Sequence, residues 1–264
     1  MAREIGSSNW LSALPLEEFG FNLNKQEFKD SLALRYGLHI FGLPDYCVCG
    51  AHFSIDHAMI CKRGGFISIR HNEINQLTAS LLKYEVCKDV EIEPELLPLT
   101  GERFQHRTLN MSENARLDVS ARGFWIRGQR AFFDTRVFYP LAPSYLNQEL
   151  KSLHRQHESE KRRTYNQRIL QVEMGSFSPL VFTSSGGQAQ ECSLFYSRLA
   201  GMIAEKRNQH KSVVKAWLRC RLGFSLLRSA LICLRGSRVL RQFDQAKDTD
   251  FDVAVQLGRL NDST

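Results

Sequence analysis

Hydrophobic and polar residues follow one another along the chain in blocks whose period changes from helical to strand-like. Over residues 70–83, apolar side chains recur three and four apart from Ile74 to Leu82, which predicts an amphipathic helix. Further along, apolar and polar residues alternate one by one, as in half-buried strands. The expected elements are a helix over 70–83, strands over 89–98, 115–122 and 129–138, a helix over 147–170, a strand over 179–184 and a helix ending near 207. The pattern therefore predicts an α/β fold.

Two of these strands contain charged residues among apolar ones. In the first, Asp118 points away from Leu117 and Val119, because successive side chains of a strand alternate between its faces. In the second, Asp134 and Arg136 share a face. Charged side chains within apolar strands are costly to bury unless they are paired or bound to a metal. Asp118 and Asp134 are therefore candidate metal ligands.

The connection between these two strands decides whether the two carboxylates meet. A two-residue turn would place Asp118 and Asp134 on opposite faces of the sheet. A shared metal site therefore requires an odd loop or a bulge, and we expect a three-residue loop over 126–128, with Gly128 in the left-handed region. This register puts Asp118 opposite Arg136 and diagonal to Asp134 on one face. Two carboxylates so close would repel each other without a cation, so the site should accept Mg²⁺.

A short stretch concentrates metal-ligating side chains in the pattern C-x-C-x7-H-x3-C, formed by Cys47, Cys49, His57 and Cys61. Zinc prefers four such ligands in a tetrahedron. The spacing of His57 and Cys61 places them on one face of a short helix, and Gly50 allows a tight turn between the first pair. The alternative is a pair of buried cysteines beside surface histidines such as His52. The spacing favours a closed, structural zinc site over a catalytic one.

Composition narrows the class of protein. The chain has 264 residues, of which 43% are hydrophobic and 24% charged, and these are ordinary values for a globular protein. No run is long and apolar enough for a membrane helix, and the first residues do not resemble a signal peptide. The seven cysteines show no disulfide-scaffold spacing, which favours a reducing compartment. We therefore expect a protein that is not secreted.

The net charge of +7 is unevenly distributed. Between Lys151 and Arg241 there are 17 Lys and Arg against 5 Glu and no Asp, a balance of +12. Such a segment suggests a polyanionic partner, nucleic acid first and an anionic membrane second, or else a solvated charged face. The candidate phosphate contacts are Arg162, Arg163, Arg168, Arg219, Arg221 and Arg228.

Two further features belong to this basic half. Apolar residues from Trp217 to Leu234 step by three and four, which predicts a helix packed on the domain with its arginines available to DNA. The run SSGG at 184–187 lies between a predicted strand and a helix, where backbone amides could hold a phosphate, although such a pair of glycines is more often only a turn. The tail after Gln242 is polar and is expected to fray.

Several runs, in their order along the chain, resemble the C-terminal part of non-LTR (LINE-type) retrotransposon polyproteins. They are RHNEINQLTASLL at 70–82, ARLDVSARGFWIRGQRAFFDTRVFYPLAPSY at 115–145 and WLRCRLGFSLLRSALICLRGSR at 217–238. The run WLSALPLEEFGFNLNKQEFKDSLALRYGL at 10–38 resembles the segment that links the polymerase to a zinc knuckle in these elements. In this family a reverse transcriptase precedes a CCHC knuckle and a restriction-like, PD-(D/E)xK endonuclease. The likeness covers roughly residues 9 to 238, and the chain has no YxDD-type polymerase turn.

The resemblance implies a restriction-endonuclease-like core of order α-β-β-β-α-β with flanking helices and an N-terminal zinc knuckle. Asp118 and Asp134 would hold catalytic Mg²⁺ or Mn²⁺, with Glu73 approaching from the first helix. Arg136 stands where the family has a lysine on the strand. Lys161 and Tyr165 would correspond to the basic residue and tyrosine of the next helix, with Lys161 replacing the strand lysine. Alternatively, Lys161 belongs to a solvated basic helix.

These implications define four segments and one function. The segments are a linker helix segment at 1–45, the knuckle at 46–66, the endonuclease domain at 67–241 and the polar tail at 242–264. The expected function is a metal-dependent endonuclease that nicks target DNA, or alternatively a catalytically silent nucleic-acid-binding relic. The expected partners are duplex DNA and, as a further candidate, the element's RNA, with no membrane and no small-molecule cofactor. The expected location is the nucleus, or the cytoplasm before import.

Overall fold

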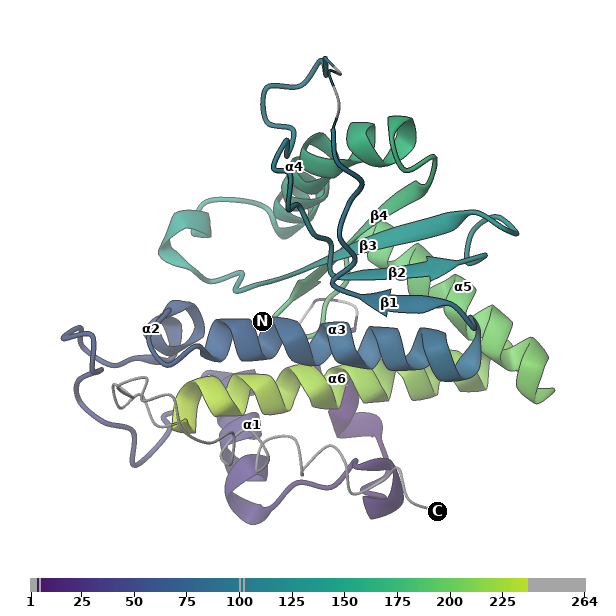
Figure 1. The fold of residues 1–264 in the computed structure, drawn as a ribbon. Helices are drawn as coiled ribbons and strands as arrows, with labels where there is room; N and C mark the ends of the chain where they lie inside the picture. The colour runs from purple at the N-terminus through teal and green to yellow at the C-terminus, as the bar shows by residue number, and fades with distance from the viewer. Residues whose placement is uncertain (1–3, 5, 100, 102, 237–264) are drawn as a thin grey trace, which may run out of the picture.

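A four-stranded sheet lies between helical layers in the computed structural model, which describes residues 4, 6–99, 101 and 103–236 (Figure 1). The helices and strands are α1 (Lys25–Tyr36), α2 (Ile55–Ile60), α3 (Phe66–Glu85), β1 (Val90–Ile92), β2 (Val119–Arg122), β3 (Arg130–Phe138), α4 (Leu150–Gln171), β4 (Ser176–Thr183), α5 (Gln190–Arg207) and α6 (Lys211–Arg235). Three short 3₁₀ helices accompany them, at Asn9–Ser12, Glu17–Phe19 and Pro143–Tyr145. The predicted polar tail lies outside the described residues.

The sheet is mixed, and its strands lie in the order β1-β2-β3-β4. The first three strands are antiparallel neighbours, and β4 is parallel to β3. A parallel neighbour needs a crossover connection, and α4 provides it between β3 and β4. The fold is therefore mixed α/β, and from α3 onward its elements follow the order predicted from the sequence.

The hairpin between β2 and β3 has the expected parity but a different register. Gly123 donates its N–H to the carbonyl of Gln129 at 2.7 Å, which closes a wider loop than the predicted one over 126–128. Gly128 lies in the left-handed region as expected, with φ of 82°. Val119 pairs with Phe133, and extending this register by one pair places Asp118 opposite Asp134. The prediction that Asp118 lies opposite Arg136 is therefore wrong.

The predicted strand over 115–122 is interrupted at Asp118. Val119 packs with the α3 side of the sheet, whereas Leu117 packs with Phe132 and Ile169 on the α4 side. The alternation expected for an unbroken strand would have put Leu117 and Val119 on one face. The chain bends at Asp118, and β2 begins only after it. This bend sets Asp118 at the end of the strand.

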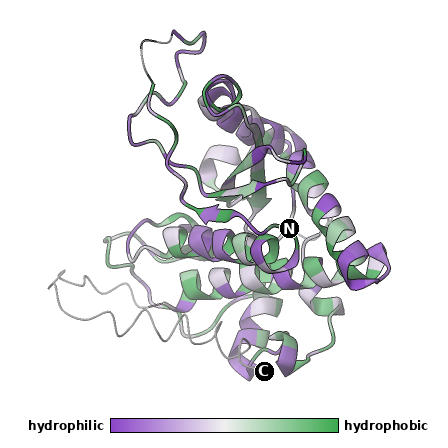
Figure 2. Ribbon diagram, turned by 45° about the vertical axis from the view of Figure 1, so that its right-hand side comes forward, coloured by the Kyte–Doolittle hydropathy of each residue, from purple (hydrophilic) through white to green (hydrophobic). Residues whose placement is uncertain are grey.

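The two faces of the sheet are covered differently. One face, which includes Ala121 and Phe133, forms the main core with α3, α5 and α6. The other face meets α4, where Phe132 packs with Ile169 and Phe138 with Leu153. In Figure 2 the hydrophilic colour dominates the outer side of α4. The α4 face contains the even-numbered residues of β3, and these include Asp134.

Helix α6 is buried more completely than its predicted stripe suggests. Leu222 and Leu226 face the main core, while Leu227 and Leu231 pack with the N-terminal segment on the opposite side. Figure 1 shows α6 between α3 and this N-terminal part of the chain. Residues 6–45 therefore form a layer that packs on α6.

Among the described helices, none is long and apolar enough to cross a membrane.

Candidate functional site

Asp118 and Asp134 lie together where β2 begins beside β3. Asp118 Oδ2 accepts a hydrogen bond from the backbone N–H of Thr135 at 2.5 Å. The Asp118 side chain thus bonds to the backbone of the neighbouring strand β3 at the point where β2 has not yet begun. Asp134 is buried, with 5% of its surface exposed. Burial raises the pKa of Asp134, and the negative charge of the neighbouring Asp118 acts in the same direction. The structure thus brings these two predicted residues together.

Lys161 reaches the same place from α4. Its Nζ atom lies 2.5 Å from Asp134 Oδ2, and its side chain is 22% exposed. The ring of Tyr165, one turn further along α4, has its centroid 6.0 Å from Nζ. Tyr165 also packs against Phe177 of β4, which fixes it beside the sheet. Lys161 therefore lies against a buried carboxylate and does not belong to a solvated basic face.

The environment of Asp134 is unfavourable for a charge. Burial raises its pKa to about 6, and the charge of Asp118 acts in the same direction. The charges of Lys161 and His71 lower the pKa, but they offset only part of the burial. A carboxyl group with a pKa displaced in this way is typical of functional sites, although structural ion pairs can produce the same displacement.

The predicted Glu73 is not at this site. It lies on the side of α3 that faces α6, where the charges of Arg228 and Arg221 act on its carboxylate. Burial nevertheless raises the pKa of Glu73. The expectation that Glu73 approaches Asp118 is therefore wrong, because that side of α3 packs on α6 and not on the sheet.

His71, which was not predicted as a site residue, lies where Glu73 was expected. Its Nε2 atom lies 3.1 Å from Asp118 Oδ2 and 3.1 Å from the carbonyl oxygen of Thr135. Burial lowers the pKa of His71, but the hydrogen bond to Asp118 and the charge of Asp118 outweigh it, so the pKa is raised. The sequence offers one signal for this residue. His71 lies two residues before Glu73 in the run RHN, and on a helix it therefore faces a different side from Glu73.

Arg136 shares the face of Asp134 but has a different partner. Its Nη1 atom donates to Glu160 Oε2 on α4 at 3.0 Å. The pair is partly exposed. His157, on α4 like Glu160, has a pKa lowered by burial and further by the charge of Arg136. The cation that contacts a candidate catalytic carboxylate is therefore Lys161 and not Arg136.

The Cys and His residues of the knuckle are positioned by a turn and a short helix. Cys47 donates its N–H to Ala51 at 2.9 Å, and Gly50 closes the turn with φ of 86°. Ser54 then caps α2, its hydroxyl accepting from the N–H of His57 at 3.1 Å. Cys61 ends this helix and donates its N–H to the carbonyl of His57. The predicted tight turn and the pairing of His57 with Cys61 are both present.

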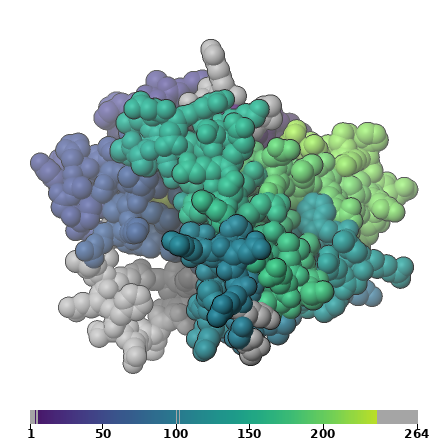
Figure 3. Space-filling model, turned by 90° about the horizontal axis from the view of Figure 1, so that it is seen from above, coloured from purple at the N-terminus to yellow at the C-terminus, as the bar shows by residue number. Residues whose placement is uncertain are grey.

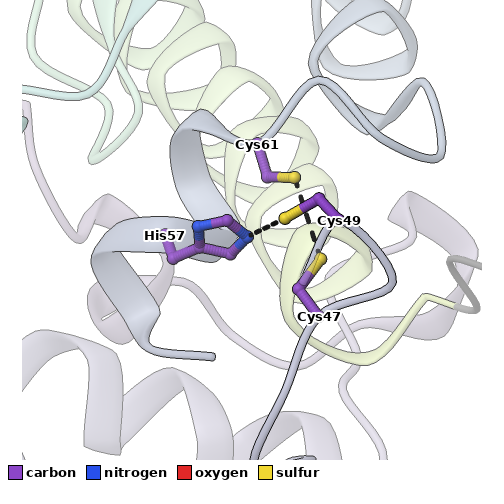
Figure 4. Close-up of side chains that lie close together, drawn as sticks. All are labelled: Cys47, Cys49, His57 and Cys61. Carbon is purple, nitrogen blue, oxygen red and sulfur yellow. Dashed lines mark hydrogen bonds between the residues drawn. The ribbon is translucent and has the colours of Figure 1, made fainter. Parts of the chain in front are cut away.

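Figure 4 shows the four side chains pointing toward one another. Their ligand atoms, on Cys47, Cys49, His57 and Cys61, all lie within 4.8 Å of one another. The sulfurs of Cys47 and Cys61 are 3.8 Å apart, and Cys49 Sγ is 3.3 Å from His57 Nε2. A zinc ion with bonds of about 2.3 Å to sulfur would hold tetrahedral sulfurs about 3.8 Å apart. The group could therefore hold a metal ion, and its geometry is consistent with a structural zinc.

The knuckle is built into the fold. Cys47 and Cys61 are buried against the end of α6, in one cluster with Phe53, Met59 and Leu234. Across the described residues, no other three His, Cys, Asp or Glu ligand atoms converge in this way. His52, the spare histidine of the pattern, lies outside the group and packs its ring edge-on against Tyr46.

Several predicted phosphate contacts serve the fold instead. Arg168 is fully buried and donates to the carbonyls of Asn110, Ser112 and Leu97 at 2.8 to 3.1 Å. These bonds tie the segment at 93–118 to α4, and Figure 3 looks down on both. The prediction that Arg168 binds nucleic acid is therefore wrong, because its guanidinium group is buried and its terminal N–H groups are bonded to these carbonyls.

The other predicted cations divide between internal contacts and the surface. Arg228 donates to the carbonyls of Gly20 and Asn22, so it holds the N-terminal segment and is not available to DNA as predicted. Arg162 forms two hydrogen bonds with Glu191, and Arg221 lies over the ring of Trp217. Arg163 and Arg219 are exposed.

The SSGG loop is occupied by another part of the chain. Thr183 Oγ1 and Ser185 Oγ donate to Glu4 Oε2 at 2.8 and 3.2 Å, and His154 Nε2 lies 3.0 Å from Glu4 Oε1. A Cβ on Gly187 would fall 1.7 Å from the Glu4 carboxyl group, so this close approach requires glycine. Hydroxyl groups here bind a carboxylate, and no phosphate site needs to be invoked.

Comparison with known proteins gives no assignment. No protein-family model matches the chain, and no curated protein matches it either. The function must therefore be argued from the site itself.

Proposed function

We propose that this chain is a divalent-metal-dependent endonuclease that nicks DNA, related to the restriction-like endonuclease region of non-LTR retrotransposons. The observation that supports this most is the meeting of Asp118, Asp134 and Lys161. Asp118 comes from the bend just before β2, Asp134 from β3 and Lys161 from α4, so two carboxylates and one ammonium group lie together at the sheet. Two acids and a cation are the side chains that metal-assisted phosphodiester hydrolysis needs.

The residues present suit a hard divalent cation. The carboxylates of Asp118 and Asp134 and the carbonyl oxygen of Thr135 are oxygen donors, the kind that Mg²⁺ and Mn²⁺ prefer. The hydroxyl oxygen of Thr135 is also buried, and among the described residues it has no hydrogen-bond partner. When bound, such an ion would polarise the scissile phosphate and lower the pKa of an attacking water.

The protein's own groups would do the remaining work. Lys161, whose Nζ lies 2.5 Å from Asp134 Oδ2, would orient a water near Asp134 and balance the negative charge that develops on the phosphate. Tyr165 packs beside Lys161 and limits the positions of its side chain. The knuckle, with a structural zinc bound to its Cys and His side chains, would hold the 46–66 segment against α6. The outer surface of this segment would then face nucleic acid.

Binding to DNA should depend strongly on salt. The exposed cations of α4 and α6, such as Arg163 and Arg219, would contact phosphates and release counterions. Duplex affinity measured by fluorescence anisotropy should therefore fall steeply between low and high salt. Asp134→Ala should bind as well as the wild type, since it removes a carboxylate and no phosphate contact. An affinity that is unchanged across the salt series would refute the electrostatic part of the proposal.

A nucleic-acid-binding protein without catalysis is the second candidate. The observation that favours it is the pairing of Arg136 with Glu160, which leaves the strand position of the family's lysine without a role at the carboxylates. Both candidates predict salt-dependent binding. Only the endonuclease predicts nicking that requires a divalent cation and Asp118.

A further inference from the structure

An open cavity lies where α4 and the N-terminal part of α5 meet the edge strand β4. Its volume is about 420 Å³. Its walls include Glu158 and Arg162 of α4, Ser178 of β4, Leu194 of α5 and Trp125 of the loop between β2 and β3. The hydrolysis proposed at Asp118 and Asp134 does not use this cavity.

Glu158 is a carboxylate that is almost buried and only half satisfied. It has 8% of its surface exposed, and its Oε1 atom accepts a hydrogen bond from the backbone N–H of Glu191 at 2.8 Å. Among the described residues, no hydrogen bond reaches its other oxygen, Oε2. Burial raises the pKa of Glu158. Because buried carboxyl oxygens normally have hydrogen-bond partners, Oε2 is available to an N–H donor that a ligand brings into the cavity.

Trp125 forms a fixed aromatic wall of the same cavity. Its Nε1 atom donates to Ser178 Oγ at 3.0 Å, and its carbonyl oxygen accepts from Arg198 Nη2 at 3.2 Å. The ring is partly buried against the main core. Leu194, with 57% of its surface exposed, adds apolar surface on the α5 side. The cavity therefore combines a flat apolar wall with a hydrogen-bond acceptor.

The charges around the cavity favour a neutral ligand. Arg162 donates through Nε to Glu191 Oε1 at 2.6 Å, so these two charges offset each other. Arg198 lies over the Trp125 ring, 5.5 Å from its centroid, and its charge balances that of Glu158. A phosphate would be repelled by the two carboxylates, and a cation by the two guanidinium groups. A planar neutral group with N–H donors on its edge, such as a nucleobase, suits this lining.

We propose that this cavity binds an unpaired guanine base of the DNA substrate, with Glu158 accepting hydrogen bonds from its edge and Trp125 packing against its ring. The inference rests on the proposed function for the ligand being DNA. Guanine has two neighbouring donors on one edge, N1–H and the amino group. Thymine has a single N–H between two carbonyl oxygens, which a carboxylate repels. Enzymes that bind displaced bases read them in this way, by hydrogen bonds to the pairing edge and by stacking on apolar side chains.

The cavity lies beside the proposed cleavage site. Lys161, which contacts Asp134, follows Glu158 by three residues on α4, so both side chains leave the same side of the helix. On β4, Ser178 directly precedes Pro179, and Pro179 pairs with Asp134 of β3. A DNA strand with a phosphate at Asp134 would therefore bring a neighbouring base to the cavity once that base leaves the stack.

The test uses the full chain with its Cys/His group loaded with zinc, without added Mg²⁺ or Mn²⁺, so that DNA is bound but not cleaved. The probes are fluorescent duplexes of one sequence with a single unpaired nucleotide, which is guanine, adenine, cytosine, thymine or an abasic unit. Anisotropy should show that wild type binds the guanine duplex at least about tenfold more tightly than the abasic duplex. Because every duplex has the same phosphates, this ratio excludes the phosphate contacts.

Two variants separate the edge contact from the stacking contact. Glu158→Gln keeps an oxygen for the Glu191 N–H but loses a carboxylate acceptor, so its preference for guanine over the other bases should fall to less than about threefold. The control, Glu149→Gln, removes the same charge from an exposed position on the same chain segment and should keep the preference. Trp125→Leu should weaken binding of all four base-containing duplexes by about tenfold and leave the abasic duplex unchanged.

Circular dichroism checks that each variant is folded. A wild type that binds the guanine and abasic duplexes equally would overturn the inference, and so would a folded Glu158→Gln that keeps the guanine preference. These outcomes are independent of cleavage. A wild type that prefers the guanine duplex but does not nick plasmid would overturn only the proposed endonuclease, whereas one that nicks plasmid and treats all five duplexes alike would overturn only the guanine cavity.

Discussion

Replacing Asp134 with asparagine should make the folded protein more stable at neutral pH. Burial raises the pKa of Asp134 from an ordinary 3.8 to about 6, even with Lys161 Nζ 2.5 Å away. At about 1.4 kcal/mol per pH unit, this rise means that folding loses about 3 kcal/mol once the carboxyl group ionises. Asparagine has the same shape and no charge. Asp134→Asn should therefore recover up to about 3 kcal/mol of unfolding free energy.

The sign of the pH dependence follows from the same values. The folded state binds the proton of Asp134 more tightly than the unfolded state does. Its stabilising effect is therefore complete below pH 3.8 and is lost as the pH rises through about 6. Urea denaturation of wild type and Asp134→Asn at several pH values measures this loss. About half of the advantage of Asp134→Asn should develop between pH 5 and pH 8.

Lys161 provides the control for this prediction. Lys161→Met removes the cation and leaves the Asp134 carboxylate unpaired, so it should lower stability at pH 8 by up to about 3 kcal/mol. In the Asp134→Asn background the same change should cost little, since no buried charge remains. The reasoning is refuted if Asp134→Asn is less stable than wild type at pH 8, or if the difference between the two proteins does not change with pH.

Two further predictions concern structural residues. Arg168→Leu should lower the unfolding free energy by about 3–5 kcal/mol because it removes three charge-assisted hydrogen bonds made by a fully buried side chain, whereas the exposed Arg163→Leu should change it by no more than about 0.5 kcal/mol. Equal effects in urea denaturation would count against the assigned role of Arg168. Wild-type protein should contain one zinc per chain by mass spectrometry of metals, and Cys61→Ser should lose it; a metal-free, stably folded wild type would contradict the zinc assignment.

Local patterns predicted the elements of the fold well. Helix α3 and strand β3 have strong periodicity, and both appear close to their predicted bounds. The two-residue period of strands allowed either parity, and the odd loop that puts Asp118 and Asp134 within reach of each other was predicted because a shared metal site requires it. The bend at Asp118 had no such signal, because it depends on a side chain that bonds to the backbone of the neighbouring strand. The exact register was wrong because the loop between β2 and β3 is wider than the predicted one over 126–128.

Which face of a helix meets the site could not be read from the sequence. His71 and Glu73 are two residues apart on α3, so they point about 200° apart around the helix. The choice between them depends on how the sheet and α6 pack on opposite sides of α3. Similarly, net charge does not reveal that Arg168 and Arg228 bond to backbone carbonyls of segments distant in the chain. Tertiary contacts decide these roles, and neither composition nor period encodes them.

The most direct test of the central claim is nicking of supercoiled plasmid by the wild type and by Asp118→Ala. Mg²⁺ and Mn²⁺ should each be added to separate reactions, with EDTA as the blank. We predict that the wild type converts supercoiled plasmid to the open circle only with a divalent cation, and that Asp118→Ala, folded and binding DNA equally well, does not. A wild type that binds the plasmid without nicking it, or an Asp118→Ala that nicks at the wild-type rate, would contradict the account.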